Sequence, residues 1–168
     1  MINFLRSTAA VAALALTATP ALAAPVSPDK QATATARIVK PLSLTWVQDL
    51  DFGTVTLVDT GPTTITVAQN GTRTCPGTAV TCSGASTAAK YLITGTNNQS
   101  VTVNASNVSM TGPAGSTPLL VTVNAPGSVN LGNSGASGAA LDIGGSISVG
   151  GGQAEGTYTG TFAVTVNY

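Results

Sequence analysis

Hydrophobic and polar residues alternate with a period of two along most of the chain beyond about residue 30. Successive side chains of a β-strand point to opposite faces of a sheet, so this period predicts strands rather than helices. Turns rich in Gly, Pro, Asn and Ser separate roughly ten such runs, a spacing that predicts a β-sandwich of short antiparallel strands. The apolar positions of the runs are Leu42, Leu44, Trp46, Leu50, Phe52, Val55, Ile65, Val67, Tyr91, Leu92, Ile93, Val101, Val103, Val108 and Met110, and further runs lie at residues 119–123, 129–131, 143–149 and 157–168.

Two positions near the start of this pattern carry specific expectations. Trp46 continues the apolar phase of Leu42 and Leu44, which predicts that its indole lies in the core. Gly53 interrupts the run that contains Phe52, and a glycine inside a strand indicates a bend or bulge.

The most regular alternation lies at the end of the sequence. One face of residues 157–168 is predicted to carry the large apolar side chains, and a slip of one residue would expose them all, so the pairing of this strand should be tightly specified. That face holds Tyr158, Gly160, Phe162, Val164, Val166 and Tyr168.

The beginning of the chain has the pattern of a secretory signal peptide. Arg6 precedes an apolar run over residues 8–19, and the small residues Ala21 and Ala23 follow, which predicts cleavage between Ala23 and Ala24. The apolar run is shorter than the ~20 residues of a membrane-spanning helix. We therefore expect export through the periplasm to the cell surface or the medium. The predicted organisation is a signal peptide (residues 1–23), an extended segment (24–40) and one β-sandwich domain (41–168).

The two cysteines, Cys75 and Cys82, are seven residues apart in a stretch rich in turn residues. In an exported chain an isolated pair of this kind predicts a disulfide. A metal or redox site is disfavoured because the spacing is not that of a Cys-x-x-Cys motif and the chain has no histidine.

Composition argues against several classes of function. Only 7% of residues are charged, and without Arg6 of the leader five basic residues stand against six acidic ones, so we expect no nucleic-acid partner. With no histidine and scattered lysines and arginines, no catalytic triad is visible, and we expect neither enzymatic activity nor a cofactor. Asp49 and Asp51 form the only close carboxylate pair. A turn and edge position before Phe52 explains them better than a glycosidase or calcium site.

Residues 31–39 alternate in a way that permits two interpretations. Ala32, Ala34, Ala36 and Ile38 would lie on one face of an extended strand that follows a polar, proline-containing lead-in. The segment has the form of a strand that fills a groove in a neighbouring subunit. Equally, it could be the first strand of its own domain.

Residues 32–55 and 143–168 resemble an uncharacterised family of exported bacterial β-domain proteins, known as a domain of unknown function. Members of this family are in turn similar to subunits of chaperone–usher pili, which have incomplete immunoglobulin-like folds. The resemblance implies an immunoglobulin-like, pilin-like sandwich with a groove beside the strand that contains Tyr158, Phe162, Val164, Val166 and Tyr168. Many pilins pair cysteines far apart in sequence, whereas Cys75 and Cys82 are close neighbours.

The sequence therefore leads to a non-enzymatic structural subunit of an extracellular filament or surface layer as the first hypothesis. Its expected partners are other copies of the chain or other surface subunits, with a periplasmic chaperone and an outer-membrane usher implied by the resemblance. The alternative hypothesis is a monomeric surface module that binds glycans, for which Trp46 and the tyrosines would supply aromatic faces.

Overall fold

The computed structural model describes residues 25–59, 61–135 and 137–168, and in these ranges the protein is all-β, with twelve strands and no helix. Every strand pair that these residues form is antiparallel. The strands are β1 (Ser43–Gln48), β2 (Thr54–Leu57), β3 (Thr63–Val67), β4 (Arg73–Thr74), β5 (Val80–Ser83), β6 (Ala89–Thr94), β7 (Ser100–Ala105), β8 (Val108–Met110), β9 (Leu119–Asn124), β10 (Ser128–Asn130), β11 (Ala139–Val149) and β12 (Val164–Asn167). Over the same ranges, no helix is long and apolar enough to cross a membrane.

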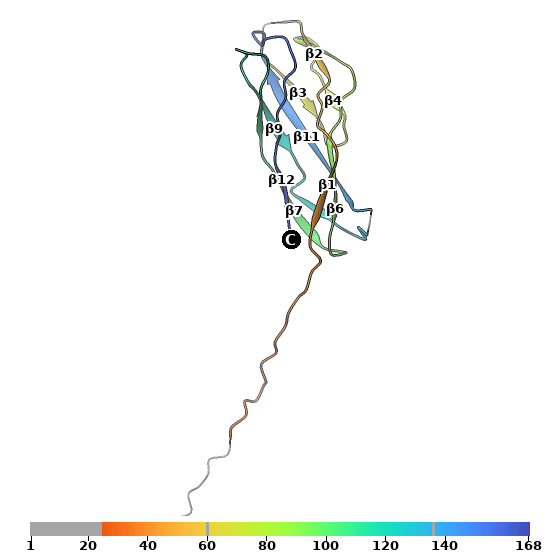
Figure 1. Cartoon of the computed structure of the whole chain (residues 1–168), viewed down its shortest axis with the longest axis vertical. Coiled ribbons are helices and arrows are strands. Elements are labelled where there is room, and N and C mark those ends of the chain that lie inside the picture. The colour runs from red at the N-terminus through yellow and green to blue at the C-terminus, as the bar shows by residue number, and fades with distance from the viewer. Residues whose placement is uncertain (1–24, 60, 136) are drawn as a thin grey trace, which may run out of the picture. The chain divides into compact units, whose positions relative to one another are not determined.

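The longest strand, β11, organises the largest sheet by pairing with three others (Figure 1). Its first half pairs with β6, and its second half lies between β3 and β9. The sheet runs in the order β1-β6-β11-β3-β4, with β9 also on β11 and β8 on β9. A second sheet has the order β10-β7-β12, and β2 and β5 form a separate two-stranded ribbon.

The core consists of two apolar clusters, one toward each half of β11. Ile147 and Val149 belong to the first cluster together with Ile65 and Val67 of β3. The second cluster contains Ile143, Leu141, Ile93, Val101, Val103 and Leu131. Of the alternating apolar positions, six are buried (Phe52, Ile65, Val67, Ile93, Val101 and Val103), and seven are partly buried (Leu42, Leu44, Leu50, Val55, Tyr91, Val108 and Met110). Alternation identified these positions because each strand buries one face.

Contacts divide the chain into two units, Met1–Ala36 and Arg37–Tyr168. Residues 25–36 of the first unit are exposed and contain no strand. The second unit begins slightly before residue 41, the predicted boundary, because the Arg37 guanidinium donates to Gln99 Oε1 and the Lys40 amide to Thr96 Oγ1 at 2.7 Å. The first strand of this unit is β1. The predicted signal peptide and the cleavage site at Ala23 and Ala24 lie outside the described residues.

The prediction that Trp46 lies in the core is wrong. The side chain is 58% exposed, and its indole N–H donates to Asp49 Oδ1 at 2.9 Å. Strand β1 is at the end of its sheet, and its register against β6 shifts between Trp46 and Gln48. The pairing is regular up to Trp46, so Trp46 keeps the phase of Leu44, but it lies on an edge strand, and period-two alternation does not distinguish a covered strand from an exposed edge.

The C-terminal run forms a shorter strand than predicted. Only Val164–Asn167 pairs as β12, against β7, and an isolated bridge joins Thr159 to Thr111. Phe162, Val164 and Val166 are half-buried and alternate with exposed residues as expected.

Candidate functional site

A groove with an apolar floor lies between two walls. One wall consists of residues 50–57, which include β2, and the other is the segment 151–158. The volume of the groove is about 790 Å³. Phe52, Leu119, Ile147 and Val149, all members of the first core cluster, line it. Core residues thus border an open cavity, an arrangement that favours the binding of apolar groups.

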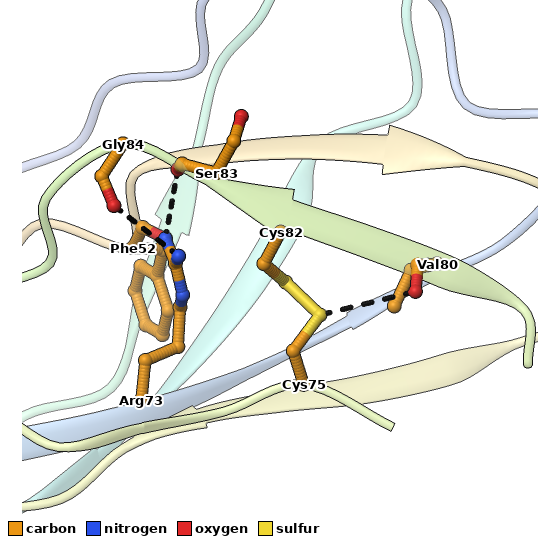
Figure 2. The surroundings of a disulfide bond; sticks show 7 residues. All are labelled: Phe52, Arg73, Cys75, Val80, Cys82, Ser83 and Gly84. Atoms are coloured by element: carbon orange, nitrogen blue, oxygen red, sulfur yellow. Dashed lines mark hydrogen bonds between the residues drawn. A yellow bond between two sulfur atoms is a disulfide. The ribbon is translucent and has the colours of Figure 1, made fainter. Parts of the chain in front are cut away.

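A bend at Phe52 and Gly53 positions the first wall of the groove. Gly53 has a φ of +71°, which a residue with a Cβ adopts only with strain. A Cβ there would also lie 2.2 Å from the Arg73 guanidinium. Arg73, on β4, donates to the carbonyls of Phe52, Ser83 and Gly84 at 2.9, 3.0 and 3.2 Å (Figure 2). This side chain therefore ties both strands of the β2–β5 ribbon to the main sheet.

A disulfide between Cys75 and Cys82 makes a second link in the same place (Figure 2). Cys82 lies on β5 opposite Val55 of β2, and Cys75 follows β4. The predicted pairing of the two cysteines is confirmed. Its structural effect is to hold the ribbon, and so the groove wall, to the edge of the main sheet.

The second wall is held by Tyr158. Its hydroxyl donates to the Ala154 carbonyl at 2.9 Å and accepts from Gln153 Nε2 at 2.7 Å. Its ring packs on Gly112, where a Cβ would come within 2.3 Å of the ring. The following bridge between Thr159 and Thr111 fixes the end of the segment, with two backbone hydrogen bonds of 2.9 Å.

A second cavity, of about 410 Å³, is polar. An ion pair of 3.3 Å between Lys90 and Asp142 contributes to its lining and cancels both charges. The amide side chains of Gln48, Gln69 and Asn70 also line it. Each of the three is already hydrogen bonded within the protein, to Ala88, Asn124 and Thr72 respectively.

The carboxylates of Asp49 and Asp51 serve local structure, as the sequence suggested. Asp51 Oδ1 accepts from the Gly53 amide at 2.8 Å, and Asp49 accepts from Trp46. Burial, and to a lesser extent the charge of Asp49, raises the pKa of Tyr91 above its usual range. In the part of the chain that the structure describes, no cluster of three or more His, Cys, Asp or Glu side chains could hold a metal ion.

The structure distributes the predicted C-terminal residues over two places. Tyr158 lines the groove. Phe162, Val164 and Val166 pack against the second core cluster instead. The hydroxyl of Tyr168 donates to the Lys40 carbonyl at 2.6 Å and accepts from the Thr96 amide at 2.8 Å, so it links β12 to the start of the domain.

The candidate donor residues Ala32, Ala34, Ala36 and Ile38 are exposed. The acidic residue Glu155 and the wall around it had no sequence signal beyond a run of glycines. The position of this wall depends on contacts between parts of the chain that are distant in sequence, namely the pairing of β11 with β3 and β9 and the bridge between Thr111 and Thr159.

Fold and groove define an all-β protein of antiparallel sheets with an opening into its core. Residues 42–168 match the family described as a domain of unknown function, DUF4402, and the chain belongs to that family. No curated protein and no solved structure matches the chain.

Proposed function

We propose that this protein is a non-enzymatic, pilin-like structural subunit of an extracellular filament or surface assembly. In this proposal the domain is an immunoglobulin-like sandwich with an incomplete sheet. Residues 31–39 of one copy complete the sheet of another by strand addition, in which main-chain hydrogen bonds supply affinity and alternate side chains enter pockets. The chain would reach the surface after export and removal of its signal peptide.

The observation that carries the proposal is the pairing of an open groove with an unpaired apolar segment in one chain. Ile38 is 93% exposed, and Ala32, Ala34 and Ala36, at the alternate positions before it, are exposed as well. Residues 31–39 contain no strand, and β12 is paired on one edge, with β7. Unpaired strand edges and exposed apolar side chains are typical of surfaces that another chain covers.

An open groove also supports the proposed need for helper proteins. Before assembly, the apolar floor and the free strand edges would promote aggregation. A periplasmic chaperone that covers the groove, and an outer-membrane usher that replaces the chaperone with the next subunit, would meet this need.

Deletion of residues 31–39 from the mature protein tests the proposal. The deletion should change the thermal unfolding transition little, because the segment forms no strand and the bond that it makes to the domain, from Arg37 to Gln99, is exposed. It should abolish the concentration-dependent oligomers that the intact mature chain forms in sedimentation velocity, alone or after release from a chaperone. An intact chain that stays monomeric under both conditions would contradict the proposal.

A second candidate function, glycan binding, gains support from the exposure of Trp46. The hydrogen bond to Asp49 fixes the indole on the edge strand β1, and an exposed, fixed aromatic ring can stack on a sugar. A glycan array with the mature monomer tests this function. Binding that the substitution Trp46→Ala abolishes would favour it, and no binding to any glycan would rule it out.

A further inference from the structure

We infer that the groove between residues 50–57 and residues 151–158 receives residues 31–39 of a second copy of this chain, and that Asp51 and Glu155 attract Arg37 of that segment and the two lysines that flank it, Lys30 and Lys40. The inference rests on the proposed function and deepens it by locating the acceptor site and its charge selectivity. It places the acceptor at the ribbon end of the domain and not along β12.

The lining of the groove indicates an extended ligand. Eight consecutive residues, Leu50 to Leu57, and six more, Gln153 to Tyr158, line it. A strand that presents its face to a cavity contributes every second residue, whereas all four residues of β2, Thr54–Leu57, line the groove, which indicates that β2 presents its edge. Strand β2 pairs with β5 along one edge. Its other edge is therefore available to pair with an added strand in the groove.

The floor suits small apolar side chains. Ile147 and Val149 reach the groove from alternate positions of β11, together with Leu119 of β9. Alternate residues of an added strand would point at this floor. In the segment these are Ala32, Ala34, Ala36 and Ile38, of which only Ile38 is large.

Charges on the two surfaces are complementary. Among the described residues that line the groove, Asp51 and Glu155 are the only ones with a charged side chain, and both are exposed. Residues 25–40 carry Lys30, Arg37 and Lys40 against the single acid Asp29. A negative groove and a positive segment attract each other and favour correct encounters.

The geometry of Lys40 favours a second copy over the segment of the same chain. Its amide donates to Thr96, and its carbonyl accepts from Tyr168. The groove begins beyond the far end of β1, whose six residues span about 20 Å. To reach its own groove, the segment would have to reverse direction beside these bonds and run back along the outer edge of β1. A segment from another molecule meets no such constraint.

Two substitutions with the same change of net charge test the electrostatic part. Glu155→Lys alters the groove, Asp29→Lys alters the charge just before residues 31–39, and both positions are exposed. In sedimentation velocity at low ionic strength, Glu155→Lys should weaken self-association about tenfold, whereas Asp29→Lys should strengthen it. Salt should reduce both effects. Equal effects of the two substitutions would overturn the charge selectivity.

A bulky side chain tests the location. Ala154→Trp places an indole in the groove, and Ala114→Trp is the matched control at an exposed position outside the lining. We expect Ala154→Trp to weaken self-association at least about tenfold and the control to change it by less than about twofold. Unchanged thermal unfolding would show that both variants fold. If Ala154→Trp fails to fold, Glu155→Lys still tests the location of the acceptor site.

The possible outcomes separate this inference from the proposed function. If deletion of residues 31–39 abolishes assembly but both groove variants behave as the wild type, the acceptor lies elsewhere, and only the present inference is overturned. If the segment is protected in a wild-type monomer, its own chain fills the groove, which also overturns the inference. A wild type that never self-associates overturns both.

Discussion

At the scale of single residues, a few side chains hold the β2–β5 ribbon to the main sheet. Arg73 provides three hydrogen bonds to carbonyls on both sides of the ribbon, and the Cys75–Cys82 disulfide adds a covalent link. The ribbon itself is short, with four paired residues on each strand. A two-stranded ribbon of this length is only marginally stable alone, so these links determine whether one wall of the groove exists.

Replacement of both cysteines by serine should lower the free energy of unfolding by about 2–3 kcal/mol, because the disulfide restrains the unfolded chain and its short loop keeps that effect modest. Urea denaturation of the two proteins measures the difference. A reducing agent should destabilise the wild type and leave the variant unchanged. Equal stability of the wild type and the variant under oxidising conditions would contradict a structural role for the disulfide.

Substitution of Arg73 by glutamine should lower the free energy of unfolding by about 2–3 kcal/mol, because three carbonyls lose a charged donor. Arg37→Gln is the matched control. Its guanidinium makes an exposed bond to Gln99, so its loss should cost less than about 0.5 kcal/mol. Similar costs for both substitutions in urea denaturation would show that Arg73 does not anchor the ribbon.

At the scale of elements, the alternation of apolar and polar residues predicted the strands that bury one face. It failed to predict strand ends and open edges, which depend on how the strands pair. Ile65, Val67, Val101 and Val103 are buried as their period predicts. Strand β11 begins at Ala139 and not at residue 143, because it pairs with β6 through a small-residue stretch that carries no alternating signal. Alternation likewise does not predict the groove, because the groove depends on which strand edges remain unpaired after distant strands have paired.

Substitution of Ile38 by alanine should weaken self-association about tenfold or more and leave monomer stability unchanged. The side chain is 93% exposed in the monomer, and its burial in a neighbour would contribute about 1.5–3 kcal/mol. Val26→Ala is the control, because Val26 is 95% exposed and lies outside residues 31–39. Sedimentation velocity and thermal unfolding measure the two quantities. Loss of monomer stability in the Ile38 variant would mean that its own domain uses this side chain.

At the scale of the whole molecule, low charge and exposed apolar groups favour association over repulsion. With 7% charged residues, little electrostatic repulsion keeps copies apart. The apolar groove and the exposed segment would promote uncontrolled aggregation in a cell interior, whereas export under chaperone control would direct them toward assembly. The proposed function therefore requires export, which the predicted signal peptide would provide.

The intact mass of the protein recovered outside the cytoplasm tests the export prediction. Cleavage after Ala23 should give a chain that begins at Ala24, lowered by two hydrogens for the disulfide. A mass that includes Met1 would contradict export through a cleaved signal peptide.

Hydrogen exchange of the mature wild-type protein across a concentration series tests the central claim, strand addition between copies, most directly. In the dilute monomer the amides of residues 31–39 should exchange at the rate of an unstructured chain, because the segment forms no strand. As assemblies form, protection should appear together in residues 31–39 and in the free edge of β2. Assemblies in which residues 31–39 remain unprotected, or a dilute monomer in which they are already protected, would contradict the claim.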